Sequence, residues 1–262
     1  MRFALMTLAL LAGCASTPPR QAVTDLAPSG TLRAAINVGN AVLAARPATP
    51  GGEPTGISVD LARELGRRLG VPVQLIVFDA AGKVVDAGRT GGWDIAFVAL
   101  DPKRAAEIAQ SPPYVQIEGS YLVKNDSPLK SNDEVDRKGH RVVVGRNSAY
   151  DLYLTRELKQ AQIVRTPTSA QVVDTMLKDN YEVSAGVKQA LENDARRLPG
   201  VRLLPGRFMV INQAMASQKG KEAGARYVRE FVEEVKASGF VAHSIDLHRQ
   251  SSAVVAPPGD PK

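Results

Sequence analysis

Short apolar runs alternate with amphipathic stretches along most of the chain. Residues 59–69 carry leucines four positions apart with polar residues between them, which predicts an amphipathic helix. Residues 32–38 form a short apolar run, and residues 93–100 form a nearly continuous one that is typical of a strand buried on both faces. Strand and helix patterns that follow each other with short turns predict an α/β fold with a parallel sheet covered by helices.

The same alternation begins again after a polar break at residues 125–128. Two longer β-rich segments, 114–123 and 208–216, frame this second series, and an amphipathic helix at 222–238 follows them. The order predicts two lobes joined by paired hinge strands. We place the first lobe at residues 30–122 and 214–248 and the second at 123–213. A cleft between two such lobes is a common place for a small ligand to bind.

The N-terminus predicts a targeting segment. Arg2 is followed by an apolar run, 4–11, that is too short to cross a bilayer. Residues 11–14 (Leu-Ala-Gly-Cys) then resemble the lipobox of bacterial lipoproteins, in which the cysteine receives lipid and the preceding peptide is removed. The resemblance implies a signal peptide at 1–14 and a lipid anchor on Cys14 in the periplasm or cell envelope. Residues 15–29 are predicted to be a flexible tether, and 249–262 a disordered tail.

Composition and charge argue against several functions. The formal net charge is +6, but the 33 basic residues are scattered without the dense run that nucleic-acid binding needs. Cys14 is the single cysteine, so we expect no disulfide and no thiolate metal site. His243 and His248 are five residues apart and would fall on different faces of a helix. We therefore expect no metal ion and no cofactor.

Three stretches carry a family resemblance, and they occur in this order: Gly-Ile-Ser-Val-Asp-Leu at 56–61, Trp-Asp-Ile at 93–95 with Asp-Pro-Lys-Arg at 101–104, and Ser-Pro-Pro-Tyr at 111–114. They resemble the family 3 solute-binding proteins of ABC transporters, the amino-acid type, over residues 32–247. The resemblance implies a monomer with the two-lobed type II periplasmic-binding fold. It also implies capture of a small carboxylate-bearing solute, such as an amino acid or a related organic acid, and its transfer to a membrane permease.

Arg104 is the first candidate for contact with the ligand. Its guanidinium offers a two-donor fork that matches a carboxylate, and the resemblance assigns it that role. The alternative is an exposed helical pair with Glu107. Asp101 stands where the family has Thr or Ser; it can cap the following helix, but it would repel a carboxylate unless it is paired. Ser148, at a turn that opens a helix, can offer a hydroxyl to the ligand or serve only as a helix cap.

Three further candidates bear on the charge of the ligand. The family acid that receives an ammonium group is replaced by Val187 or Lys188. Lys188 either faces the cleft, where it would favour a ligand with more negative charge, or is a solvated residue at the start of a helix. Asn40 ends the first strand at the cleft edge and could donate a hydrogen bond to a ligand. Glu118 in the first hinge strand lies either on the exposed face or in the cleft, where it would restore a site for a cation. Gln213 in the second hinge strand is a polar residue in a comparable position.

Two other functions stay open from the sequence. The same fold hosts enzymes similar to cyclohexadienyl dehydratase, in which Glu118 or Glu182 would be the acid. A sensory lipoprotein without a transport role is the other alternative. We expect a protein that is not an enzyme, because the cleft segments contain no second catalytic group and no histidine.

Overall fold

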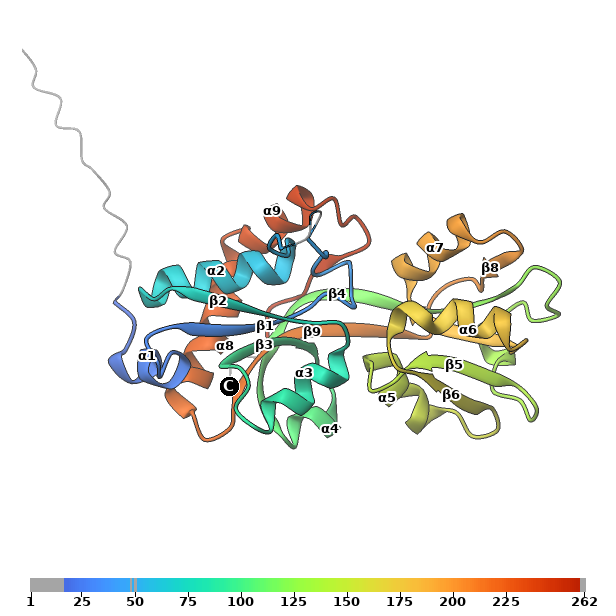
Figure 1. The fold of residues 1–262 in the computed structure, drawn as a ribbon, viewed down its shortest axis with the longest axis horizontal. Helices are drawn as coiled ribbons and strands as arrows, with labels where there is room; N and C mark the ends of the chain where they lie inside the picture. Colours follow the sequence, from blue (N-terminus) through green and yellow to red (C-terminus); the bar gives the residue numbers. More distant parts are fainter. Residues whose placement is uncertain (1–16, 48, 50, 260–262) are drawn as a thin grey trace, which may run out of the picture.

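The computed structural model describes residues 17–47, 49 and 51–259, and its strands form one mixed ten-stranded sheet (Figure 1). The main path through the sheet runs β2-β1-β3-β9-β4-β7-β5-β6, and β8 and β10 pair with β4. The predicted α/β class is therefore confirmed. None of the helices in these ranges is long and apolar enough to cross a membrane. The predicted signal peptide, 1–14, and its Cys14 lie outside the described residues.

The first lobe is built on three parallel strands. These are β1 (Leu32–Asn37), β2 (Val73–Phe78) and β3 (Ile95–Ala99). Figure 1 shows α2 and α9 on one side of the sheet and α3 on the other. The helices of this lobe are α2 (Ile57–Leu69), α3 (Ala81–Gly88), α4 (Pro102–Ala105), α8 (Glu222–Ala237) and α9 (Phe240–Leu247). The leucines of α2 are buried in one core, as their spacing predicted.

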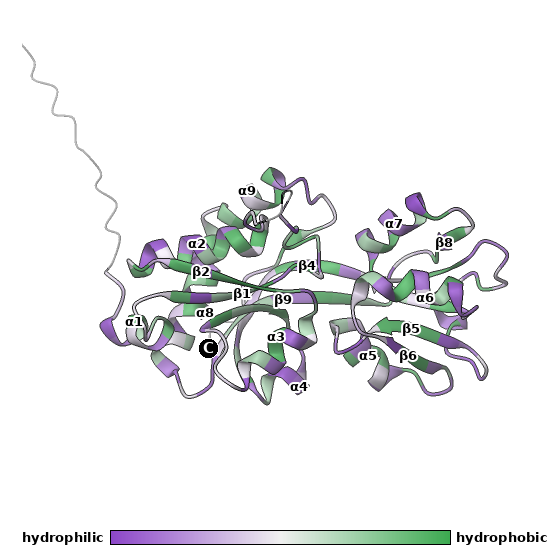
Figure 2. Ribbon diagram, viewed as in Figure 1, coloured by the Kyte–Doolittle hydropathy of each residue, from purple (hydrophilic) through white to green (hydrophobic). Residues whose placement is uncertain are grey.

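The second lobe repeats the pattern with its own core. Its strands are β5 (Arg141–Gly145), β6 (Gln162–Thr166), β7 (Val183–Val187) and β8 (Val201–Leu203). Its helices are α5 (Ala149–Glu157), α6 (Val172–Lys178) and α7 (Lys188–Arg197), with the short 3-10 turns η1 (Asn132–Glu134) and η2 (Ser169–Gln171). Figure 2 shows apolar residues along the inner strands and polar residues on the outer faces of the helices.

Two long antiparallel strands join the lobes. They are β4 (Ile108–Lys124) and β9 (Met209–Gln218), paired from Ile108 opposite Gln218 to Gly119 opposite Met209. In the first lobe β9 also pairs with β3, and in the second lobe β4 also pairs with β7. Two register shifts around Pro113 break the ladder, since a proline has no N–H to donate. The lobe boundaries that we placed at 122/123 and 213/214 fall inside these strands.

The prediction of a flexible tether at 15–29 is wrong for most of that segment. Residues Arg20–Leu26 form helix α1, in which Ala22 and Leu26 are fully buried. A side-chain carboxylate oxygen of Asp25 accepts the Gly224 N–H, 3.0 Å away, in the first turn of α8. The Ser, Thr and Pro content of this segment suggested a flexible chain. The short helix α1 forms because its two buried apolar side chains pack on α8, which is far away in the sequence.

The prediction of a disordered tail at 249–262 is also wrong for residues up to 259. Strand β10 (Val254–Val255) pairs antiparallel with Val115 and Gln116 of β4. The flanking Ala253 and Ala256 are buried. A tail rich in proline is ordered here because β4 offers backbone N–H and C=O groups that need partners. Residues 260–262 lie outside the described residues.

Candidate functional site

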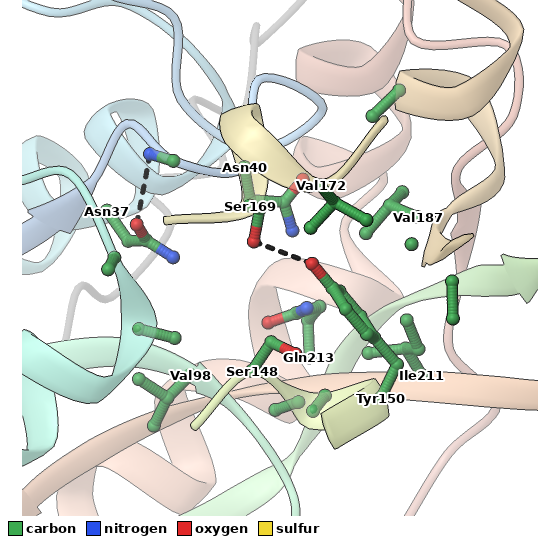
Figure 3. A pocket seen from close by; sticks show the side chains of 18 of the residues that line it. Asn37, Asn40, Val98, Ser148, Tyr150, Ser169, Val172, Val187, Ile211 and Gln213 are labelled. Atoms are coloured by element: carbon green, nitrogen blue, oxygen red, sulfur yellow. Dashed lines mark hydrogen bonds between the residues drawn. The ribbon is translucent and has the colours of Figure 1, made fainter. Parts of the chain in front are cut away.

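A cleft of about 700 Å³, open to solvent, lies between the two lobes (Figure 3). The first lobe lines it with residues at the ends of β1 and β3 and with Arg104, which comes from the short helix α4. The second lobe lines it with the first turn of α5, the turn η2 and one face of α7. Ile211 and Gln213 of the hinge strand β9 form its floor. The structure therefore brings Arg104, Ser148 and Asn40 together at one cleft, and their contact with a ligand stays a prediction.

Arg104 is held by the strand-to-helix turn after β3. Asp101 caps α4 by accepting the Lys103 N–H, 2.9 Å away, and Pro102 occupies the first helical position. The Arg104 side chain is 2% exposed. Its Nη1 donates to the Ala99 carbonyl at 3.0 Å, and its Nη2 donates to the Asn147 carbonyl in the second lobe at 2.8 Å. Arg104 is therefore not an exposed partner of Glu107.

The charge of Arg104 is buried without an ion-pair partner among the described residues, although the nearby carboxylate of Asp101 acts to raise its pKa. Both hydrogen-bond acceptors are neutral carbonyl oxygens, and none of the ion pairs within the described ranges includes Arg104. Burial lowers the pKa of Arg104 to about 10, so the guanidinium is charged at neutral pH. A buried charge is normally paired with an opposite one, because its lost hydration is costly. The arrangement favours an anionic group in the cleft.

Ser148 caps helix α5 beside the cleft. Its Oγ accepts the Asp151 N–H at 3.1 Å, which confirms the cap interpretation; contact with a ligand stays a prediction. The first-turn N–H groups of Ala149 and Tyr150 have no partner inside the helix and carry partial positive charge. The Tyr150 hydroxyl donates to Ser169 Oγ at 2.7 Å, and burial raises the pKa of this phenol, which is therefore neutral.

Asp101 does not line the cleft. Besides capping α4, its carboxylate accepts a 2.9 Å hydrogen bond from Arg156 of α5 in the second lobe. The Asp101 side chain is 3% exposed and the Arg156 side chain 45%. This ion pair neutralises the carboxylate that would otherwise repel an anion, and it joins the two lobes.

The interpretation in which Lys188 faces the cleft is wrong. Lys188 Nζ donates to Glu118 at 2.9 Å, and Arg207 donates to the same carboxylate at 2.6 Å. These three residues lie outside the cleft, so Glu118 does not provide a cation site within it. The chain passes from β7 into α7 at this point, and Val187, not its neighbour Lys188, lines the cleft.

The sequence interpretation missed the face of α7 that lines the cleft. Its members are Ala190, Leu191 and Asp194, which continue from Val187 at the end of β7. Their spacing of three and four is the helical repeat, which is the signal that would have identified them. Asp194 is the acid of this set, and it accepts a 2.9 Å hydrogen bond from Arg197 one turn later.

Neither acid of the enzyme alternative is suited to donate a proton in the cleft. Glu182 is bound by Arg141 at 2.6 Å, and neither Glu182 nor Glu118 lines the cleft. The hydrogen bond from Arg141 holds the pKa of Glu182 below its usual range, and those from Lys188 and Arg207 do the same for Glu118. A catalytic acid needs the opposite shift. Within the described ranges, no group of three or more His, Cys, Asp or Glu residues is arranged so that it could bind a metal ion.

Comparison with known proteins agrees with this architecture. The model of the bacterial extracellular solute-binding proteins, family 3, matches residues 40–246. A search of the curated proteins finds no match. The structure is similar to a solute receptor for L-cysteine of Neisseria gonorrhoeae, with 18% identity and a TM-score of 0.75 over 88% of this chain and 94% of that one.

Two other solved structures show the same fold. The P235GK mutant of ArgBP from T. maritima has 18% identity and a TM-score of 0.73, over 87% of this chain and 99% of that one. The ancestral amino acid-binding protein AncCDT-1, a precursor of cyclohexadienyl dehydratase, has 20% identity and a TM-score of 0.71. The match covers 88% of this chain and 98% of that one. With a family match over most of its length and this two-lobed architecture, the chain belongs to family 3 of the bacterial extracellular solute-binding proteins.

Proposed function

We propose that this protein captures a small carboxylate-bearing solute, an amino acid or a related organic acid, in the inter-lobe cleft. It delivers the solute to the membrane permease of an ABC transporter and is not itself an enzyme. The observation that carries the proposal is the buried guanidinium of Arg104, which lines the cleft and has only neutral carbonyl partners. A carboxylate at this position would supply the missing negative charge.

The second lobe supports the same position for the carboxylate. Ser148 and the first turn of α5 face Arg104 across the cleft, and a helix N-terminus favours negative charge. Related folds bind amino acids: one neighbour is a receptor for L-cysteine, and another from Streptococcus pneumoniae was solved bound to L-arginine. We infer that the cleft of this chain is used for the same class of task.

The test is isothermal titration calorimetry with a panel of amino acids, hydroxy acids, oxo acids and their uncharged amides. We expect a carboxylate to bind and its amide to fail. Arg104→Met should weaken the best ligand by about 2 kcal/mol or more, which is about 30-fold in Kd. Arg89→Met is the matched control, because Arg89 pairs with Glu107 away from this cleft. Equal binding of acid and amide, or unchanged affinity in Arg104→Met, would refute the proposal.

The location of the protein forms a separate part of the proposal. The lipobox-like segment 11–14 and its single cysteine indicate a lipid anchor on Cys14 in the periplasm or cell envelope. Cells fed a labelled fatty acid should yield labelled protein, and Cys14→Ser should abolish the label. Label retained by the Cys14→Ser variant would refute the anchor without touching the ligand proposal.

A further inference from the structure

We propose that the cleft selects a carboxylic acid whose second polar group is a neutral hydrogen-bond donor, such as a hydroxyl, and not an ammonium. Gln213 is the residue that recognises this group. The inference rests on the proposed function, since it presupposes that a carboxylate binds at Arg104. It deepens that function by naming the class of solute.

Among the described residues, the cleft lining holds one cation and one acid, and the acid already has an arginine partner. They are Arg104 and Asp194. The Asp194 carboxylate already accepts a 2.9 Å hydrogen bond from Arg197, whose same nitrogen also reaches Asp174 at 3.1 Å. The Asp194 carboxylate thus already has a cationic partner, which it shares with Asp174, whereas the hydrogen-bond acceptors of Arg104 among the described residues are neutral carbonyl oxygens. A carboxylate therefore finds a cation without an ion-pair partner in the cleft, whereas an ammonium group would compete with Arg197 for Asp194.

The walls of the cleft are largely aliphatic. The apolar lining includes Val98, Val172, Val187, Leu191 and Ile211. An ammonium group placed against such walls would lose hydration, and the one acid among the described lining residues, Asp194, is already bound by Arg197. A hydroxyl loses far less, because it is neutral and needs only hydrogen-bond partners.

Gln213 supplies a partner for a neutral group. It lies on β9 opposite Ala99 of β3 and Val115 of β4, so strands on both sides fix its backbone. The residue is only 5% exposed, and Figure 3 shows its carboxamide in the open centre of the pocket beside Ser148, without a hydrogen bond to the other residues drawn. The carboxamide is therefore open to the cleft, where its oxygen can accept and its NH2 group can donate a hydrogen bond to a ligand.

Asn40 adds a second neutral amide to the same cleft. It ends the turn after β1 and lines the cleft opposite the second lobe. Its side-chain oxygen is buried and has no hydrogen-bond partner among the described residues. The Gln213 carboxamide, which can both accept and donate, matches a hydroxyl, which also does both, better than an oxo group, which only accepts.

The experiment compares matched acids on the full chain. Alanine, leucine and phenylalanine are each titrated beside the 2-hydroxy acid and the 2-oxo acid with the same side chain. Within the best series, we expect the hydroxy acid to bind about tenfold or more tightly than the amino acid, because a buried site rejects a group it cannot pair. An amino acid that binds as tightly as its hydroxy acid overturns the inference and leaves the proposed function standing. If none of the acids binds, both the inference and the proposed function fail.

Two variants test the role of Gln213. Gln213→Glu adds a carboxylate at the centre of the cleft and should reverse the preference toward the amino acid by about tenfold. Gln213→Met keeps the length of the side chain and should weaken binding of the hydroxy acid about tenfold more than binding of the unsubstituted acid. Gln189→Glu is the control, since it adds the same charge on α7 outside the cleft. Circular dichroism confirms folding of each variant, and an unchanged preference in folded Gln213→Glu overturns the assignment.

Discussion

The guanidinium of Arg104 in the first lobe donates a 2.8 Å hydrogen bond to the carbonyl oxygen of Asn147 in the second lobe. Asn147 has a φ of 56°, in the left-handed region that asparagine tolerates better than most residues. Because Arg104 also lines the cleft, one side chain contacts both the ligand space and the opposite lobe. Binding at Arg104 and closure of the lobes are therefore expected to be coupled.

Gly82→Ala should hinder closure of the lobes. A β-carbon at Gly82 of α3 would lie 2.8 Å from the β-carbon of Asn147 in the second lobe. Such overpacking costs about 1–3 kcal/mol, so we expect the Kd of the best ligand to rise about 5- to 150-fold. The melting temperature of the ligand-free protein should not fall, since alanine favours a helix over glycine by about 0.5–1 kcal/mol.

Small-angle X-ray scattering checks the Gly82→Ala mechanism. The wild-type protein should become more compact when the ligand is added, and the variant should change less. Lys83→Ala on the same helix is the control. The Lys83 side chain is exposed, and its ion-pair partner, Asp79, precedes α3 in the same lobe. Unaltered affinity in Gly82→Ala would mean that the lobes meet differently in solution.

The ion pair between Asp101 and Arg156 should increase the affinity for the ligand by favouring closure of the two lobes, without contact with the ligand. Neither residue lines the cleft, yet their 2.9 Å contact joins the lobes. In a double-mutant cycle with Asp101→Asn and Arg156→Ala, we expect a coupling of about 1 kcal/mol in ligand binding, because one partner is partly exposed. The same cycle on the Asp86–Arg89 pair, which lies within the first lobe, should show no coupling to affinity. Additive effects in the first cycle would contradict the prediction.

Helix α1 should contribute to the stability of the first lobe. Leu26 is fully buried where α1 packs on α8, so Leu26→Ala leaves a cavity. We expect a loss of about 2–5 kcal/mol in the free energy of unfolding, measured by urea denaturation. Thr24→Ala on the exposed face of the same helix should change it by less than about 0.5 kcal/mol. Equal effects of the two variants would indicate that α1 is detached in solution.

Glu64 of α2 should stabilise the protein in a pH-dependent way. Hydrogen bonds from Arg67 and Arg68 lower the pKa of Glu64 to about 2, despite its partial burial. An acid with a lowered pKa stabilises the folded state fully above its unfolded pKa, and this contribution is lost as the pH falls through the folded value. After allowance for solvent screening, Glu64→Gln should cost about 1–2 kcal/mol at pH 7.

The difference between Glu64→Gln and the wild type should shrink by about half or more between pH 7 and pH 3. Urea denaturation of both proteins at each pH measures it. Glu53→Gln is the control, because Glu53 is exposed and pairs with a single arginine. A difference that stays constant over this range would show that the hydrogen bonds, and not the charge, matter.

Much of the fold could be predicted because its signals are local. The leucine spacing of α2 and the apolar run of β3 depend only on neighbouring residues, and both elements form where the pattern predicted them. Arg104 was identified through the family resemblance of residues 101–104, and its place at the start of a helix after a buried strand agreed with that resemblance. The short elements α1 and β10 escaped prediction, since each is stabilised by contact with a distant partner.

By itself the sequence determined the order of strands and helices and the two-lobed plan, and its resemblance to a known family singled out Arg104 as a ligand contact. Only the tertiary structure decided which neighbours these side chains have. Residues 104 and 147 meet across the lobes, and the passage from β7 into α7 turns Val187 toward the cleft and Lys188 toward Glu118. The physical reason is that periodicity fixes which face of an element is apolar, whereas the partners of a polar group depend on how separate elements pack.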